Sequence, residues 1–282
     1  MLLRDFLPCP TLTALVRCIG IVHFTFSKDE AVPPKAFSPR PGESLCFFPK
    51  YPEYVMYPGE SEKTKRPPAF VMGQHTLLTQ RYVGREFLAV IVHFQPGALY
   101  RLAGIPSYEF TNTCLEAEEV FSKEIRFVNE QLNTANSYGE LLAIVESYLL
   151  KLISQSKKKA HGVETAAEIL LKGEGQSSLS WLAKETCLCF KQFERKFKER
   201  MGVSPSLFAR IARFDTAFKT KNAHPQKDWL SIAIQCGYHD YQHLVRDYKA
   251  FTGYTPTSFF HRDQEAPERI LHLHENGAIA LR

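Results

Sequence analysis

The stretch from residue 179 to residue 260 repeats one short pattern, and this duplication constrains the fold more than any other feature of the chain. Gly202 and Gly253 lie 51 residues apart, and the residues around them match at the same offset. The matching pairs are Arg195 and Arg246, Phe197 and Tyr248, Lys198 and Lys249, Pro205 and Pro256, and Phe208 and Phe259. An internal repeat indicates repeated structural modules. Two copies are too few for a solenoid, so the sequence predicts a pair of matched modules held at a fixed distance.

Each copy predicts a short helix, a tight turn and a longer helix. The short helices are expected at Ser180–Thr186 and Trp229–Cys236, and Gly237 suits the left-handed conformation that ends the second one. Asp240 suits the N-cap of the second long helix. The first long helix carries an apolar stripe at helical spacing, made of Phe190, Phe193, Phe197 and Met201. This order of elements, with a polar and basic outer face, predicts a helix-turn-helix in each copy.

Many fixed spacings agree in the second copy. They involve Ile232, Ala233, Gly237, Tyr238, His243, Arg246, Lys249, Gly253, Thr255, Pro256 and Phe259. These residues resemble the DNA-binding domain of the AraC/XylS-type transcriptional regulators. The resemblance implies two helix-turn-helix units joined by a long helix, here Pro205–Lys221, and preceded by a helix at Val163–Lys172. The first copy departs from the family pattern in its turn, where Cys187-Leu188-Cys189 replaces Gly and a Ser or Thr cap.

The positive charge of the chain is concentrated in the same region. Residues 156–260 contain 17 Lys and Arg against 10 Asp and Glu, a balance of +7. Residues 1–155 and 261–282 each have a balance of −1, which accounts for the net charge of +5. A basic module suits a polyanion such as DNA. Charge alone would favour a solvated basic surface on an ordinary helical domain, and it is the paired helix-turn-helix that favours DNA.

Residues 1–155 predict a separate β-rich domain. Short runs rich in aromatic and β-branched residues are separated by Pro and Gly, which is typical of a small barrel or sandwich. The expected strands are Ile19–Ser27, Ser44–Phe48, Tyr54–Tyr57, Ala69–Gly73, Thr76–Tyr82 and Phe87–Phe94, followed by helices at Gly97–Leu102 and near Glu116–Asn133. The stretches Gly73–Thr76 and Val92–Ala98 resemble the N-terminal sensor domain of one branch of these regulators. That resemblance implies a cupin-like domain with an undefined ligand.

The predicted fold is therefore α+β with two domains. A cupin-like β-rich domain spans residues 1–155, an all-α domain with two helix-turn-helix units spans 156–260, and a tail spans 261–282. An amphipathic helix at Tyr138–Ile153 either covers the β-rich core or forms a homodimer contact. A polar, basic linker is expected at Ser154–Ala160.

The resemblance also assigns DNA-contacting residues. In the first unit Lys191, Glu194 and Arg195 are expected at base edges with Gln192 beside them, and Gln242, Val245 and Arg246 take these places in the second unit, next to Tyr241. Lys196, Lys198, Arg200 and Lys249 are expected to face phosphates. The alternative for Arg195 and Arg246 is a surface salt bridge or a phosphate clamp.

A small-molecule effector is expected inside the β-rich domain. Four polar residues in or beside its strands could orient a ligand: His75, Arg81, His93 and Gln95. Their direction depends on the strand register, because a shift of one residue turns a side chain to the other face. The alternative is a filled barrel that binds no ligand and only dimerises.

Enzyme chemistry finds little support in the sequence. Metal-binding cupins need a His-x-His cluster with a nearby carboxylate, and His23, His75 and His93 lack that spacing. The cysteines also lack the spacing of a zinc site. His272 and His274 lack a third ligand, and phosphate loops and nucleophile elbows are absent. We therefore expect neither a metal nor a cofactor, with a cupin-like metalloenzyme domain as the weaker alternative.

Seven scattered Cys predict reduced thiols, and neither a signal peptide nor a long apolar run is found. The chain is expected to be a cytoplasmic regulator without a membrane partner, acting on double-stranded operator DNA and RNA polymerase.

Overall fold

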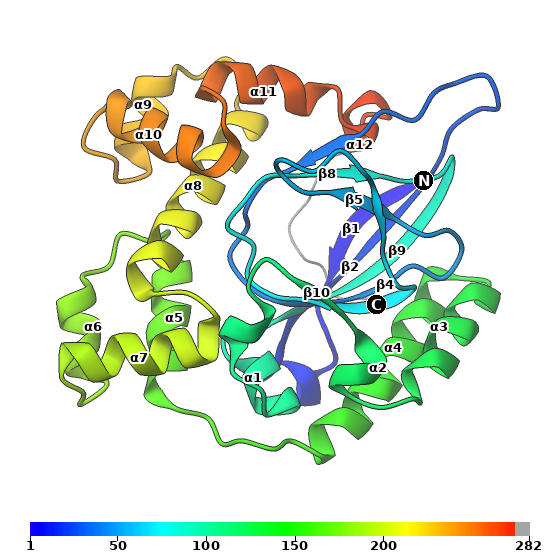
Figure 1. Cartoon of the computed structure of the whole chain (residues 1–282), viewed down its shortest axis with the longest axis horizontal. Coiled ribbons are helices and arrows are strands. Elements are labelled where there is room, and N and C mark those ends of the chain that lie inside the picture. The colour runs from blue at the N-terminus through cyan, green and yellow to red at the C-terminus, as the bar shows by residue number, and fades with distance from the viewer. Residues whose placement is uncertain (274–282) are drawn as a thin grey trace.

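The computed structural model describes residues 1–273 and divides into a β-rich N-terminal region and a helical C-terminal region (Figure 1). This arrangement confirms the predicted α+β organisation. No helix in the described part of the chain is both long and apolar enough to cross a bilayer.

The larger sheet has six strands in the order β1-β2-β9-β4-β7-β10, and every neighbouring pair is antiparallel. Its strands are β1 Leu2–Phe6, β2 Val16–Thr25, β9 Glu86–Phe94, β4 Ser44–Phe47, β7 Ala69–Met72 and β10 Cys114–Glu116. Alternate side chains of β2 pack into two different hydrophobic cores, because successive residues of a strand face opposite sides of the sheet. Ile19 and Ile21 pack toward the helices, whereas Phe24 packs into an aromatic cluster inside the barrel.

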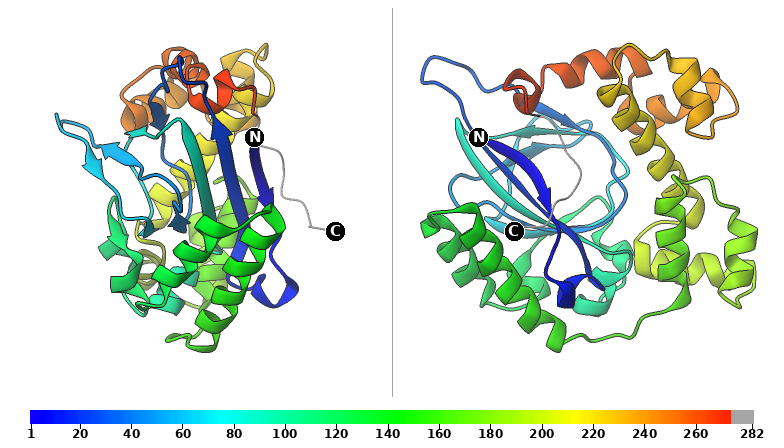
Figure 2. Two further views of the ribbon diagram at one scale, coloured as in Figure 1. Left: turned by 90° about the vertical axis from the view of Figure 1, so that its right-hand side faces the viewer. Right: turned by 180° about the vertical axis from the view of Figure 1, so that it is seen from behind.

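The smaller sheet has four strands in the order β3-β8-β5-β6. These strands are β3 Lys35–Phe37, β8 Thr79–Tyr82, β5 Tyr54–Met56 and β6 Thr64–Lys65. Together the two sheets curve around a common interior (Figures 1 and 2). All residues of β4 and β7 are buried, because helices cover the outer face of the larger sheet and the barrel interior covers the other.

The N-terminal helices are α1 Ala98–Ala103, α2 Ala117–Val120, α3 Ile125–Thr134 and α4 Tyr138–Ser154, with short 3-10 turns at Pro10–Leu12 (η1) and Ser107–Phe110 (η2). The single helix expected near Glu116–Asn133 is two helices, since residues 121–124 form a turn between α2 and α3. The apolar stripe of α4 is buried in the core of its own chain. That burial favours the core-covering alternative, because the same side chains cannot also face a partner subunit.

The C-terminal helices are α5 Gly162–Lys172, α6 Leu179–Glu185, α7 Phe190–Met201, α8 Pro205–Ala223, α9 Trp229–Gln235, α10 Tyr241–Thr252, α11 Pro256–Gln264 and α12 Pro267–Ile270. We call α6 with α7 the first unit and α9 with α10 the second unit. Each has its own core, and α8 contributes Phe208 to the first and Phe214 and Phe218 to the second. The long helix therefore connects the two units by packing into both.

Local chemistry explains why these helices start and stop where they do. The side chains of Ser204 and Asp240 accept backbone N–H groups at the starts of α8 and α10. Gly202 and Gly253 end α7 and α10 in the left-handed conformation. In the first turn Cys187 has a φ of 55°, so this residue adopts a conformation that glycine takes more easily.

One sequence expectation needs correction in this region, and the structure completes one segment that the sequence left open. Phe190 was expected in the apolar stripe of α7 but is 46% exposed, because it begins the helix at the edge of the unit. The segment after residue 260 was assigned to a tail, and its structure was left open. Its described part completes α11, forms α12 and brings Leu271 and Leu273 against the aromatic cluster of the barrel. His274 lies outside the described residues.

Candidate DNA-binding surface and interior cavity

The outer face of α7 carries most of the residues expected to read DNA in the first unit. Lys191, Gln192, Arg195 and Lys198 are exposed, while Glu194 and Lys196 are partly buried. The opposite face places Phe193 and Phe197 in the core. One side of the helix is therefore anchored while the other stays free for a ligand.

Arg200 does not fit the expectation of a phosphate contact. Its side chain is buried, forms an ion pair with Glu164 of α5 and lies over the ring of Tyr100 in α1, 4.7 Å from the ring centre. Arg101 of α1 also lies 3.7 Å from Glu164. Arg200 thus holds the first unit against the N-terminal region. Lys196 pairs with Glu199 at 3.0 Å.

The second unit presents a matching surface on α10. Gln242, Arg246 and Lys249 are exposed, and Tyr241 and Val245 are partly buried. The core side of α10 holds Leu244 and Tyr248, as the repeat predicts. Helices α7 and α10 lie at opposite ends of α8 (Figure 1).

The length of α8 suits DNA. Its 19 residues span about 28 Å at 1.5 Å per residue. Successive major-groove segments on one face of DNA are ~34 Å apart. The connecting helix therefore brings the two units to a separation of the same order as one turn of the duplex.

The N-terminal region contacts the helical C-terminal region at two separate places. The first unit meets η2, where Ser107 Oγ donates to the carbonyl of Arg200 at 2.9 Å and Thr111 Oγ1 donates to the carbonyl of Gly202 at 2.9 Å. Gly202 allows this approach, since a Cβ there would lie 2.8 Å from Thr111 Oγ1. Beyond the second unit, Glu268 of α12 is buried and forms an ion pair with Lys35 of β3.

The barrel interior contains a cavity of about 420 Å³. Its wall is mostly apolar and aromatic, with Phe24, Phe48 and Phe87 among its residues. Asp215 and Lys219 of α8 and Glu268 of α12 complete the wall. The cavity is therefore bounded by both the N-terminal region and the helical C-terminal region.

Three of the four predicted ligand residues line this cavity: His75, Arg81 and His93. Gln95 does not. It follows the end of β9, its Nε2 donates to the carbonyl of Thr13 at 3.2 Å, and it faces a different groove. The ligand role of the other three stays a prediction.

His75 and Arg81 form a buried polar wall. Neither ring nitrogen of His75 has a hydrogen-bond partner in the described part of the chain. Burial, reinforced by the nearby Arg81 and Arg66, lowers the pKa of His75 to about 3. Arg81 lies over the ring of Phe37 and 3.8 Å from Glu53. Burial lowers the pKa of Arg81 to about 10, and the nearby Glu53 opposes this shift. At neutral pH the imidazole of His75 is therefore neutral and the guanidinium of Arg81 is positively charged.

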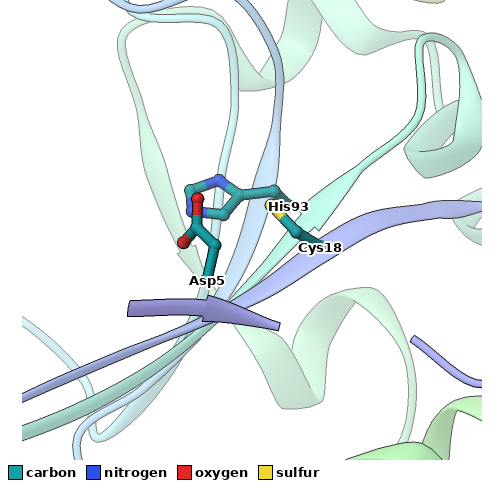
Figure 3. Close-up of side chains that lie close together, drawn as sticks. All are labelled: Asp5, Cys18 and His93. Atoms are coloured by element: carbon teal, nitrogen blue, oxygen red, sulfur yellow. The ribbon is translucent and has the colours of Figure 1, made fainter. Parts of the chain in front are cut away.

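A second polar group in the cavity wall was not foreseen from the sequence. Asp5, Cys18 and His93 come from β1, β2 and β9, and their donor atoms lie within 4.8 Å of one another (Figure 3). Burial, with help from the Asp5 carboxylate, raises the pKa of Cys18 to about 11. The three residues are far apart in sequence and β1 was not predicted, so only the strand register could have revealed the group.

Crystal structures of ToxT from Vibrio cholerae are similar to this chain over most of its length. One is 11% identical and covers 89% of this chain and 98% of ToxT, with a TM-score of 0.46. Another, at 1.65 Å resolution, is 11% identical and covers 86% and 98%, with a TM-score of 0.49. A third, of wild-type ToxT bound to an unsaturated fatty acid, is 10% identical and covers 86% and 94%, with a TM-score of 0.46. At this level of identity and TM-score the likeness carries no functional assignment.

No curated protein matches the sequence of the chain. Residues 4–116 match a family described as a domain of unknown function (DUF6597). Residues 182–262, which run from α6 into α11, match a family described as a helix-turn-helix domain. The duplicated motif, the two helix-turn-helix units on either end of α8 and this match identify a C-terminal DNA-binding domain of the AraC/XylS type, and the chain is a DNA-binding transcription regulator.

Proposed function

We propose that this regulator binds a specific double-stranded operator through α7 and α10 and that a small-molecule effector in the barrel cavity sets its DNA affinity. The observation that carries the proposal is the composition of the cavity wall. Residues of α8, which joins the two units, stand beside residues of the barrel strands. We further propose that the chain acts in the cytoplasm by binding rather than by catalysis.

The wall explains how an effector could change DNA binding. A ligand shifts a conformational equilibrium only by the difference in its affinity for the two states. Asp215 and Lys219 can contribute to ligand binding only while α8 stays against the barrel. An effector that contacts them would therefore favour one placement of the DNA-reading units over another.

The lining also indicates the chemical class of the effector. The aromatic wall suits an apolar body, and the volume suits a small molecule. Buried polar groups normally have hydrogen-bond partners. Among residues 1–273, which the structure describes, the Nε of Arg81 and both ring nitrogens of His75 have none. We infer an amphipathic ligand whose polar end accepts hydrogen bonds and carries partial or full negative charge.

The test uses the full chain. A thermal-shift screen of small amphipathic anions is followed by titration of operator DNA with and without each hit. A true effector is expected to change DNA affinity by about 5- to 150-fold, the range of typical allosteric coupling. Arg81→Met should abolish the thermal shift, whereas Lys50→Met, at the surface of the same region, should not.

A hit that raises the melting temperature and leaves both DNA affinity and transcription unchanged would end the effector proposal. The dimerisation-only alternative is less favoured, because the apolar stripe of α4 is buried within the chain. Contact with RNA polymerase stays a prediction from family resemblance.

A further inference from the structure

The group of Asp5, Cys18 and His93 is built by the register of three neighbouring strands. Asp5 pairs with Gly20 across β1 and β2, and Cys18 pairs with His93 across β2 and β9. Directly paired residues of antiparallel strands point to the same face, as do residues two apart in one strand. Cys18 and Gly20 share a face of β2, so all three side chains point to the cavity side of the sheet.

Gly20 provides the space in which two of the donors meet. A Cβ at this position would lie 2.9 Å from Asp5 Oδ1 and 3.5 Å from His93 Nε2. Any larger residue here would push into the carboxylate and crowd the imidazole. The absence of a side chain at Gly20 therefore lets the carboxylate of β1 and the imidazole of β9 approach each other over β2.

The imidazole is also held in one orientation. Ser44 Oγ of β4 lies 3.1 Å from His93 Nδ1, which directs Nε2 toward Asp5 and Cys18. Metal-binding histidines almost always bond a second group through the other ring nitrogen, which fixes the ring. Four adjacent strands of one sheet thus contribute three donors and one orienting hydroxyl.

We propose that Asp5, Cys18 and His93 form a binding site for a divalent metal ion of the zinc class, with its remaining coordination position open to the cavity. Zinc accepts thiolate, imidazole and carboxylate ligands, and sites with three protein ligands keep a fourth position for water or another ligand. Magnesium and calcium prefer oxygen ligands throughout, which excludes them from a site with Cys and His.

This inference goes beyond effector control and does not depend on it. It differs from the sequence-based expectation that the chain holds no metal. That expectation rested on ligands that are neighbours in sequence, whereas these ligands are neighbours through strand pairing. The competing explanation for this group is a contact between Asp5 and His93 without a metal, with Cys18 packed beside them by chance.

The test is a cobalt(II) titration of the purified, metal-free full chain. Cobalt occupies zinc sites and gives a thiolate-to-cobalt charge-transfer band only when a cysteine is a ligand. We expect the band to saturate at one equivalent and to disappear on addition of zinc. Zinc affinity is measured in parallel with a competing chromophoric chelator.

Matched variants identify the ligands. Cys18→Ser should remove the band and weaken zinc binding by more than about 100-fold, and Ser44→Ala should weaken it by about 10- to 100-fold. Cys46→Ser is the control, because Cys46 is another buried cysteine in the wall of the same cavity but lies outside the group. His93→Gln provides a second ligand variant in case Cys18→Ser fails to fold, which circular dichroism would show.

Two results would overturn the site. One is the absence of a saturable cobalt band at one equivalent. The other is a band that survives in a folded Cys18→Ser or His93→Gln protein, which would place the metal on other thiols such as the exposed Cys187 and Cys189.

Discussion

Arg195 and Arg246 occupy equivalent positions in the two units, and both are exposed. A guanidinium group can bind the edge of guanine with two hydrogen bonds. We expect Arg195→Ala to cost about 1–3 kcal/mol on the operator and to relax its sequence preference. Titration of operator and random duplexes measures both effects, with Arg126→Ala on the exposed surface of α3 as the control. Equal losses on the two duplexes would make Arg195 a phosphate contact instead.

Glu43 makes stability depend on pH at the junction of the two regions. Its carboxyl is buried beside Ser107, Leu171 and Met201, and burial raises its pKa from 4.5 to about 8. The folded state therefore holds a proton that the unfolded state releases at lower pH. The contribution of Glu43 to stability should be greatest below pH ~4.5 and fall as the pH rises toward ~8, by up to about 1.4 kcal/mol per pH unit.

Urea unfolding of the chain at several pH values measures this slope. Glu43→Gln keeps the shape of the side chain and should flatten the slope between pH ~5 and ~8. If the variant keeps the slope of the parent, another group is responsible for it.

Single residues also show where sequence reasoning stops. Arg195 and Arg200 lie on one basic helix and look alike in the sequence, yet Arg195 is exposed and Arg200 is buried against Glu164. The burial comes from α1 and α5, which no local pattern could place. Gln95 was expected in the cavity, but the chain leaves the sheet at Phe94 and the side chain turns away. Asp5 was missed because it lies in a short strand with charged residues at its centre.

The basic face of α7 should contribute to the salt dependence of DNA binding. Lys198 is exposed at the C-terminal half of this helix. Each lysine that neutralises a phosphate releases counterions, so Lys198→Ala should reduce the log–log salt slope by about one. Lys151→Ala on the exposed side of α4 is the control. An unchanged slope in Lys198→Ala would remove this residue from the interface.

Helix α4 allows a comparison of two neighbouring leucines. Leu149 is 1% exposed and packs in the core, whereas Leu150 is 41% exposed. Leu149→Ala should lower the free energy of unfolding by about 2–5 kcal/mol, and Leu150→Ala should change it by less than about 0.5 kcal/mol. Denaturant unfolding measures both. A larger decrease in the free energy of unfolding for Leu150→Ala, together with a change in oligomeric state, would support the dimer contact at α4.

At the level of elements, the sequence predicted the C-terminal region well because each helix carries its own signals. These signals are local in sequence: helix caps such as Ser204 and Asp240, and the apolar stripes of α7 and α10. Because the motif is repeated, an element predicted in one copy can be compared with its equivalent in the other. The β-rich region was predicted less completely. β3 and β10 contain three residues each, and they are strands only because β8 and β7 pair with them.

For the whole molecule, the ion pair of Lys35 and Glu268 ties the end of the helical region to the barrel. Lys35→Met keeps the aliphatic stem but leaves Glu268 without its cation, and uncompensated buried charge is destabilising. We expect faster amide hydrogen exchange across α12, with little change in β4. Lys50→Met is the matched control, because Lys50 and Glu86 pair on the surface within the barrel region. If amide hydrogen exchange across α12 were the same in Lys35→Met and Lys50→Met, the Lys35–Glu268 ion pair would not be what holds α12 against the barrel.

The packing of Leu271 and Leu273 has a consequence for biosynthesis. These two side chains cover an aromatic cluster that β2, β4 and β9 help to build, and those strands leave the ribosome long before residue 271 does. Chains fold as they emerge, with the N-terminal part first. The barrel strands are therefore made before the segment that covers this side of the cluster, and until Leu271 and Leu273 are synthesised that side stays accessible to water and to chaperones.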